Sequence, residues 1–209
     1  MIKDEAWKKE KEAIVASYAE KNREIEPGGT VFCGSSLTER FPVEEWTGGK
    51  VVNRGVGGYT IAEYARVIDI CCTDLRPSKV FISIGSNDLN DETSDTKRLI
   101  SDYRKLLSDI MDAVPGVRLY VMAYYPVNDD TDDEFMKEEL KYRTNEVIDR
   151  ANAMIRAMCD DIGAVYIDVN SPLKDKNSKL VKKYSVDGVH IDEKGYKIVF
   201  EVLKKHIEK

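Results

Sequence analysis

Five short apolar segments recur along the sequence, and a stretch with helical periodicity or a turn-rich stretch separates each from the next. The apolar segments cover residues 30–33, 50–53, 79–84, 118–124 and 164–169. Because they are apolar throughout rather than at alternate positions, they are typical of parallel strands buried on both faces. Right-handed crossovers between such strands give a three-layer α/β/α sandwich. We therefore expect an α/β protein with a five-stranded parallel sheet.

Helical patterns occupy about residues 60–75, 95–114, 135–161 and 194–207. A further amphipathic helix is predicted over about residues 4–25, with an apolar face made of Trp7, Ile14, Tyr18 and Ile25. A chain of 209 residues without an internal repeat or a low-complexity linker fits one domain. We expect a single domain over residues 1–209, with the N-terminal helix of residues 1–28 packing on it.

The net charge is −6 and the isoelectric point is about 5.2. This balance argues against nucleic acid or an anionic membrane as the partner, because both require a basic face. No apolar stretch approaches the ~18 residues that span a bilayer. The N-terminal residues lack the apolar core of a signal peptide. We expect a cytoplasmic protein that acts on a small molecule, and the sequence leaves the oligomeric state open.

Metal-binding spacings are absent from the sequence. The four cysteines do not form C-x-x-C and are predicted to be buried free thiols: Cys33, Cys71, Cys72 and Cys159. The acidic run 128–134 has Asp133 where a calcium loop needs glycine, so it reads as a solvated loop before a helix. We expect neither a metal nor another cofactor.

Small polar residues follow the first three strands and precede the last helix. Each of these segments taken alone is an ordinary turn or helix cap. In a parallel sheet, however, ligands bind at the carboxyl ends of the strands. Together the segments supply every group that acyl transfer needs: Gly34-Ser35-Ser36-Leu37, Asn53 to Gly58, Gly85-Ser86-Asn87-Asp88 and Asp187-Gly188-Val189-His190.

Ser36 is the candidate nucleophile, since it lies where a strand turns into a helix. A serine hydroxyl needs a base with a near-neutral pKa, and that requirement points to histidine. Of the two histidines, His206 lies in the last turn of the terminal helix and reads as solvated, which leaves His190. Asp187 precedes His190 by three residues and is the candidate partner of its Nδ1 atom.

Three groups are candidates for the oxyanion hole: the backbone N–H of Ser36, the backbone N–H of Gly58 and the side-chain amide of Asn87. Asn53, Gly85 and Asp88 are expected to shape the loops. Aromatic side chains near the strand ends could line a substrate pocket, although core packing is the competing interpretation. They are Trp46, in the loop after the nucleophile's helix, Tyr124 and Tyr125.

These four segments resemble, in order, the four blocks of the SGNH, or GDSL-like, hydrolase family. Ser36, Gly58, Asn87 and His190 match the four residues for which the family is named, and the blocks span most of the chain. Ser35 stands where many members carry aspartate. Two serines are therefore adjacent, and register with the family favours Ser36 as the nucleophile. The resemblance implies a flavodoxin-like sheet and a metal-independent esterase or acylhydrolase.

The predicted function is hydrolysis of a carboxylic ester by a Ser-His-Asp triad through an acyl-enzyme, with a short acyl group such as the acetyl ester of a carbohydrate. A lysophospholipase or thioesterase type of acylhydrolase and an O-acyltransferase remain open on the same site. A non-catalytic carbohydrate- or partner-binding module is the alternative of a different class. An α/β-hydrolase is disfavoured because G-x-S-x-G is missing, and a dinucleotide fingerprint is disfavoured because Thr60 occupies its third glycine position.

Overall fold

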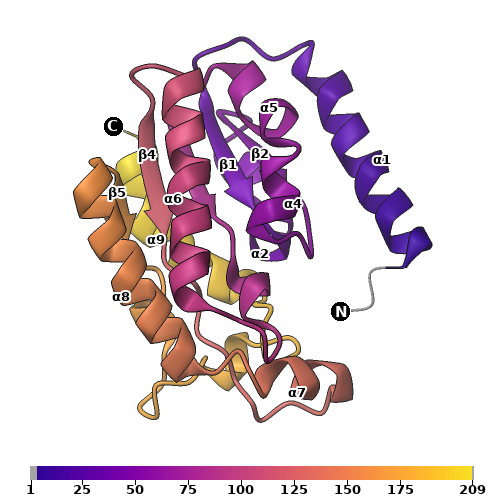
Figure 1. Cartoon of the computed structure of the whole chain (residues 1–209), viewed down its shortest axis with the longest axis vertical. Coiled ribbons are helices and arrows are strands. Elements are labelled where there is room, and N and C mark those ends of the chain that lie inside the picture. Colours follow the sequence, from indigo (N-terminus) through magenta and orange to yellow (C-terminus); the bar gives the residue numbers. More distant parts are fainter. Residues whose placement is uncertain (1–3, 209) are drawn as a thin grey trace. The chain divides into compact units, whose positions relative to one another are not determined.

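A computed structural model describes residues 4–208 (Figure 1). Its strands form one five-stranded parallel sheet in the order β2-β1-β3-β4-β5. This confirms the α/β class, and the order is that of flavodoxin-like sheets. The strands are β1 (Thr30–Gly34), β2 (Val51–Gly55), β3 (Lys79–Ser83), β4 (Arg118–Met122) and β5 (Val165–Ile167).

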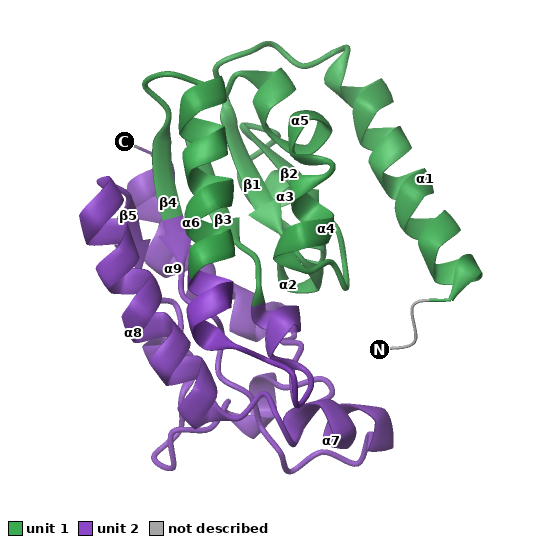
Figure 2. Cartoon of the chain, viewed as in Figure 1, with its two compact units in different colours: residues 1–85, 101–120 green, residues 86–100, 121–209 purple. Residues whose placement is uncertain are grey.

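The chain divides into two compact units (Figure 2). The first contains the described residues up to 85 together with residues 101–120. The second contains residues 86–100 and the described residues from 121 onward. Each unit has its own buried side chains and hydrogen bonds, and each is described separately below.

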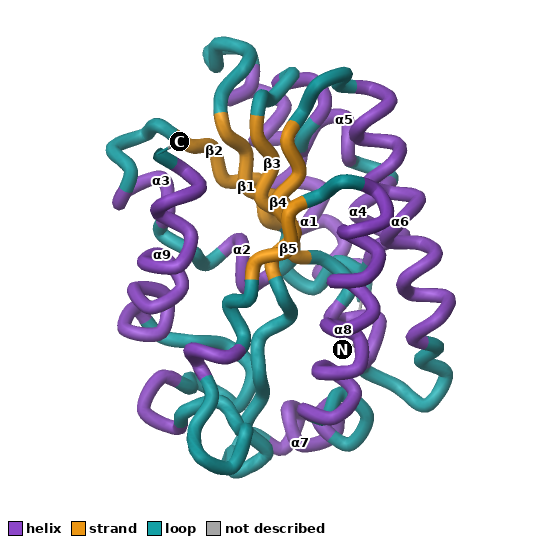
Figure 3. Tube along the Cα trace, turned by 90° about the vertical axis from the view of Figure 1, so that its left-hand side faces the viewer, coloured by secondary structure: helices purple, strands orange, loops and turns teal. Residues whose placement is uncertain are grey.

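In the first unit, β1 pairs in parallel with both β2 and β3. Phe32 of β1 stacks on Phe81 of β3 with 4.7 Å between ring centroids, and Phe81 stacks on Tyr120 at 4.6 Å. All three side chains are buried, so an aromatic row ties three strands together. Figure 3 shows α3 on one side of these strands and α4 and α5 on the other. The helices are α2 (Ser36–Glu39), α3 (Val43–Trp46), α4 (Ile61–Ala65), α5 (Ile68–Cys71), η1 (Thr73–Leu75) and α6 (Thr96–Ala113), whose first turn belongs to the second unit.

The N-terminal helix, α1 (Glu5–Asn22), also packs within the first unit. Asp4 begins it by accepting a hydrogen bond from the Trp7 N–H. The Tyr18 hydroxyl donates to the Gly55 carbonyl at 2.7 Å, and the Asn22 amide donates to the Ile70 carbonyl at 2.7 Å. The predicted apolar face is incomplete, because the buried residues of α1 are Lys11 and Val15. Ile25 lies beyond the end of the helix.

The second unit contains β5 with α8 and α9 on opposite sides of it (Figure 3). The prediction of one helix over residues 135–161 is wrong, because Thr144 adopts an extended conformation and caps a new helix by accepting from the Val147 N–H. The prediction of one helix over residues 60–75 is also wrong, since Val67 leaves the helical conformation between α4 and α5. The helices of this unit are η2 (Ser86–Leu89), α7 (Glu134–Leu140), α8 (Asn145–Ile162), η3 (Ser171–Leu173), η4 (Lys182–Tyr184) and α9 (Glu193–Ile207).

All four cysteines are buried free thiols, as predicted. Burial raises the pKa of both Cys71 and Cys159 to about 12, so these thiols stay protonated at neutral pH. No helix within residues 4–208 combines the length and the apolar character needed to cross a bilayer.

Candidate active site

Ser36 begins the short helix α2 directly after β1. The turn between them requires glycine at position 34, where φ is +156°. A Cβ atom there would lie 2.2 Å from Oγ1 of Thr38 and 2.4 Å from the Ser83 carbonyl oxygen. Ser36 is half-buried, whereas its neighbour Ser35 is only 3% exposed. Of the two adjacent serines, Ser36 is therefore the more exposed.

Gly58 lies in the loop after β2, next to the end of β1. Gly34 and Gly55 are register partners, and the Val56 N–H donates to the Gly34 carbonyl at 2.9 Å. Gly58 is buried and has φ +78°, a conformation that side chains disfavour. Thr60 ends the loop by forming a capping box with Glu63 at the start of α4. The structure thus places Ser36 and Gly58 after the carboxyl ends of two neighbouring strands.

Asn53 shapes these loops. Its amide nitrogen donates to the carbonyl oxygens of Thr38 at 2.7 Å and Phe41 at 3.0 Å. Its amide oxygen accepts from the Gly55 N–H at 2.9 Å. One side chain therefore ties the end of β2 to the segment that leaves α2, which is the loop-shaping role predicted for it.

Asp187 and His190 form a hydrogen-bonded pair in the second unit. Nδ1 of His190 lies 2.6 Å from Oδ2 of Asp187. The other carboxylate oxygen accepts from the backbone N–H groups of His190 at 2.8 Å and Val189 at 3.0 Å. The His190 side chain is 10% exposed and the Asp187 side chain is 18% exposed, so little water competes for these bonds. With Nδ1 bonded to the carboxylate, Nε2 is the ring nitrogen suited to act as a general base.

The surroundings of Asp187 keep it ionised. Burial acts to raise its pKa, but the hydrogen bonds from the His190 side chain and backbone outweigh burial and hold the pKa well below its ordinary value of 3.8. The turn itself depends on Gly188, which has φ +97° and whose Cβ would meet the Asn128 carbonyl oxygen at 2.6 Å. The Gly188 N–H donates to Oγ of Ser185 at 2.8 Å, a contact that the sequence pattern did not indicate.

Asn87 lies in η2, four residues after the last residue of β3, and is half-buried. The predicted site residues therefore divide between the units. Ser36 and Gly58 belong to the first, and Asn87, Asp187 and His190 belong to the second. Within the units, the structure brings together Asp187 and His190 by a hydrogen bond, and the loops of Ser36 and Gly58 by strand pairing.

The three aromatic candidates are buried or make ring contacts in the structure. The prediction that Trp46 lies in a loop is wrong, because Trp46 is the last residue of α3. Its ring packs against that of Phe41 in an edge-on arrangement with 5.8 Å between ring centroids. The side chains of Tyr124 and Tyr125 are buried, and burial raises the pKa of Tyr125 well above its ordinary value. The side chain of Asn152 fixes the backbone of Tyr124, because its amide oxygen accepts from the Tyr124 N–H at 2.8 Å and its amide nitrogen donates to the Tyr124 carbonyl at 3.0 Å. A role of these aromatic residues in lining the substrate site stays a prediction.

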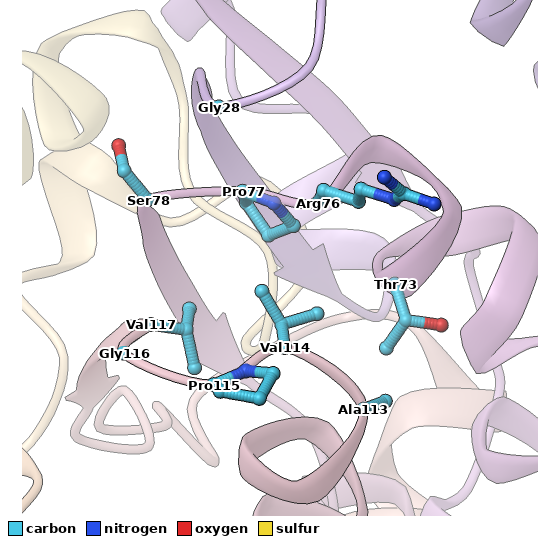
Figure 4. Close-up of a pocket in the computed structure, with 10 residues that line it drawn as sticks. All are labelled: Gly28, Thr73, Arg76, Pro77, Ser78, Ala113, Val114, Pro115, Gly116 and Val117. Carbon is cyan, nitrogen blue, oxygen red and sulfur yellow. The ribbon is translucent and has the colours of Figure 1, made fainter.

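A pocket of about 560 Å³ lies at the amino ends of strands in the first unit (Figure 4). Its lining residues precede the strands: Gly28 comes before β1, Pro77 and Ser78 before β3, and Gly116 and Val117 before β4. Ser36 and Gly58 follow their strands, so this pocket is not the candidate site. Within residues 4–208, no group of three or more His, Cys, Asp or Glu side chains could hold a metal ion.

Glu39, which the sequence analysis did not single out, contacts the loop of Gly58. It is the last residue of α2, three positions after Ser36, and its Oε2 atom accepts a hydrogen bond from the Gly57 N–H. A position three residues along a helix lies on the same face. The spacing from Ser36 was therefore an available signal, although it does not reveal the partner of the carboxylate.

A flavodoxin-like sheet with a serine after one strand and a histidine–carboxylate pair in the same chain carries residue types that ester hydrolysis can use. The sequence profile described as "GDSL-like Lipase/Acylhydrolase family" matches residues 17–198. The chain therefore belongs to the GDSL-like lipase/acylhydrolase family, the SGNH hydrolases that it resembles in sequence, and is an ester-bond hydrolase.

Solved structures share the fold. A protein from Streptococcus pneumonia whose description names platelet activating factor is 24% identical, with 95% of this chain and 93% of that chain covered and a TM-score of 0.85. A GDSL-like lipase from Bacteroides thetaiotaomicron is 21% identical, with 93% and 97% covered and a TM-score of 0.78. Est24, a carbohydrate acetylesterase from Sinorhizobium meliloti, is 15% identical, with 86% and 98% covered and a TM-score of 0.71. A comparison with curated proteins gives no match.

Proposed function

We propose that this protein is a serine esterase that removes short acyl groups, such as acetyl, from a carbohydrate or another small soluble ester. The observation that carries the proposal is the 2.6 Å hydrogen bond between Nδ1 of His190 and Oδ2 of Asp187. A binding module has no need of an imidazole held by an ionised carboxylate. A serine nucleophile does need one, because its hydroxyl is a weak nucleophile without a base.

In the first step, Oγ of Ser36 attacks the carbonyl carbon of the ester while Nε2 of His190 takes the hydroxyl proton. The C=O π bond opens, and its electron pair becomes the charge on the oxyanion. The N–H groups of Ser36 and Gly58 and the side-chain amide of Asn87 donate hydrogen bonds to this oxygen. The ionised Asp187 stabilises the imidazolium that forms.

The tetrahedral intermediate collapses when the bond to the leaving alcohol breaks and Nε2 of His190 returns its proton to that oxygen. The acyl group is then bonded to Ser36. Water then attacks in the same way. Nε2 of His190 takes a proton from the water, and the water oxygen bonds to the acyl carbon. The bond to Oγ of Ser36 breaks, and His190 returns the proton to that oxygen. The products are one alcohol and one carboxylic acid, and the enzyme is regenerated.

The short acyl group is inferred from the sequence and from one relative. No extended apolar segment resembles the lid of a lipase, and a net charge of −6 suits a soluble substrate rather than an anionic lipid surface. Est24, which shares the fold, is described as a carbohydrate acetylesterase and supports the same substrate class. If a sugar hydroxyl replaced water in the second step, the same site would perform acyl transfer.

A series of chromogenic esters with increasing acyl length tests the substrate class. We expect kcat/KM to be highest for acetyl and to fall as the chain lengthens, and a maximum at long chains would contradict the proposal. A serine-directed phosphonate, followed by peptide mass spectrometry, tests the nucleophile. We expect the label on Ser36, and a label on any other residue would require a different mechanism.

A further inference from the structure

The backbone loop that carries Gly58 is held by a side chain from the nucleophile's own helix. Oε2 of Glu39 accepts a hydrogen bond from the N–H of Gly57, the residue immediately before Gly58. The backbone of Glu39 is fixed in turn, because its N–H donates to the Ser35 carbonyl at 2.9 Å. One residue thus connects the segment of Ser36 to the segment of Gly58 within the first unit.

Little space separates α2 from the end of β2. A Cβ atom at Gly55 would lie 2.2 Å from the backbone nitrogen of Glu39. A Cβ atom at Gly57 would lie 3.0 Å from Oε2 of Glu39 and 3.4 Å from Nζ of Lys11. Two glycines therefore allow the carboxylate of Glu39 to approach the loop backbone directly.

The N-terminal helix supplies the counter-charge. Nζ of Lys11 lies 3.8 Å from Oε2 of Glu39, and the Lys11 side chain is only 9% exposed. Lys11 also pairs with the exposed Glu10 at 3.0 Å. A second contact from the same helix reaches the loop, since the Trp7 ring lies 5.9 Å from the Tyr59 ring. A lysine is rarely buried without a charged partner, and here that partner touches the loop.

We infer that Glu39, held by Lys11, is a positioning residue that fixes the glycine loop and thereby aims the Gly58 N–H at the developing oxyanion. This inference rests on the proposed function. Consecutive glycines leave the Gly57–Gly58 peptide with few conformational restraints of its own. A hydrogen bond to an ionised carboxylate is stronger than one between neutral groups, so it restrains the loop before substrate arrives. Oxyanion stabilisation depends on donors that are already oriented.

The test compares Glu39→Ala, Glu39→Gln and Lys11→Met with the matched control Lys8→Met. Lys8 forms an exposed ion pair with Glu5 on the same helix, so its removal deletes a pair that does not reach the loop. We expect Glu39→Ala to lower kcat about 10- to 100-fold with KM unchanged, less than the loss of a whole oxyanion donor. Glu39→Gln keeps an oxygen that accepts from the Gly57 N–H and should recover most of the rate. The kcat of Lys11→Met should lie between those of Glu39→Ala and Glu39→Gln, and the kcat of Lys8→Met should match that of the wild type.

Amide hydrogen exchange over residues 56–60 supplies a readout independent of turnover. We expect faster exchange in Glu39→Ala than in Glu39→Gln, with no change in α6. If Glu39→Ala fails to fold, Lys11→Met still decides the question. Wild-type kcat in Glu39→Ala or in Lys11→Met, or a change in KM alone, would overturn the positioning role. Ser36→Ala, measured alongside, separates the two proposals, because a fully active Ser36→Ala would refute the esterase mechanism whatever Glu39 does.

Discussion

Nδ1 of His190 and Oδ2 of Asp187 are 2.6 Å apart, although the turn that joins these residues contains only Gly188 and Val189. The same carboxylate also holds the backbone N–H groups of Val189 and His190. Asp187 therefore orients both the imidazole ring and the loop from which the ring projects. The turn is also held by a distant segment, because the Asn128 N–H donates to the Gly188 carbonyl at 2.7 Å.

Replacing Asp187 by asparagine should lower kcat by up to about 10⁴-fold, because the amide no longer fixes the imidazole tautomer or stabilises the imidazolium. The measurement is kcat on an acetyl ester across the pH range. Asp168→Asn is the matched control, since Asp168 also has a lowered pKa in the second unit but bonds Asn170 and Ser171. Equal losses in both variants would indicate a structural rather than a catalytic effect.

Asp187 should also make stability depend on pH. Folding lowers its pKa from 3.8, so the unfolded chain binds more protons than the native state in acid. Its stabilising contribution is fully present above the unfolded pKa and is lost as pH falls through the lower folded value. Urea midpoints at pH 6, 4.5 and 3 should therefore fall less steeply in Asp187→Asn than in the wild type. If the urea midpoints of the two proteins fell by the same amount with decreasing pH, Asp187 would not contribute to the pH dependence of stability.

Ser36→Ala should abolish hydrolysis of a chromogenic acetyl ester, whereas Ser35→Ala should keep most of the activity. Ser35 is 3% exposed and its side chain caps no helix N–H, so its hydroxyl has neither access nor a local role in α2. Steady-state rates and phosphonate labelling of both variants check this. An inactive Ser35→Ala that still folds, beside an active Ser36→Ala, would reverse the assignment.

Asn87→Ala should lower kcat by about 10²–10³-fold with little change in KM, as expected for the loss of one oxyanion donor. Asn87→Asp should be at least as slow, because a carboxylate repels the developing negative charge. Single-turnover acylation rates provide the measurement. An effect confined to KM would instead assign Asn87 to substrate binding.

Incubation with a chelator should leave kcat and KM unchanged. In the proposed mechanism His190 transfers the proton between Ser36 and the leaving alcohol, and N–H donors stabilise the oxyanion. Each step is therefore complete without a metal. The assay compares activity before and after dialysis against EDTA. Activity that is lost on dialysis and restored by a divalent cation would contradict the proposed chemistry.

The sheet was predictable because its signal is local. Each of the five apolar segments overlaps an observed strand. All residues of β1 are buried, as expected for a strand that is apolar along its whole length, whereas β5 leaves Val165 exposed. The short helices were less predictable. The break at Thr144 depends on one hydroxyl that accepts from the Val147 N–H, and helical periodicity on both sides conceals it.

Lys11 and Glu39 show why some contacts near the candidate site could not be predicted. A lysine on an amphipathic helix normally marks the solvated face, yet Lys11 is buried because an acidic partner from a distant segment meets it. Pairs of this kind depend on tertiary packing. The turn from Asp187 to His190 was predictable for the opposite reason, because both partners lie within three residues.

The four buried thiols make the protein suited to site-specific labelling. Cys33, Cys71, Cys72 and Cys159 are all 0% exposed, and thiol reagents attack the exposed thiolate. A cysteine introduced on the surface would therefore react alone in the folded protein, and no native cysteine would have to be removed first. The native four would become modified only when the chain opens, so the rate of their alkylation would report how often the core is disrupted.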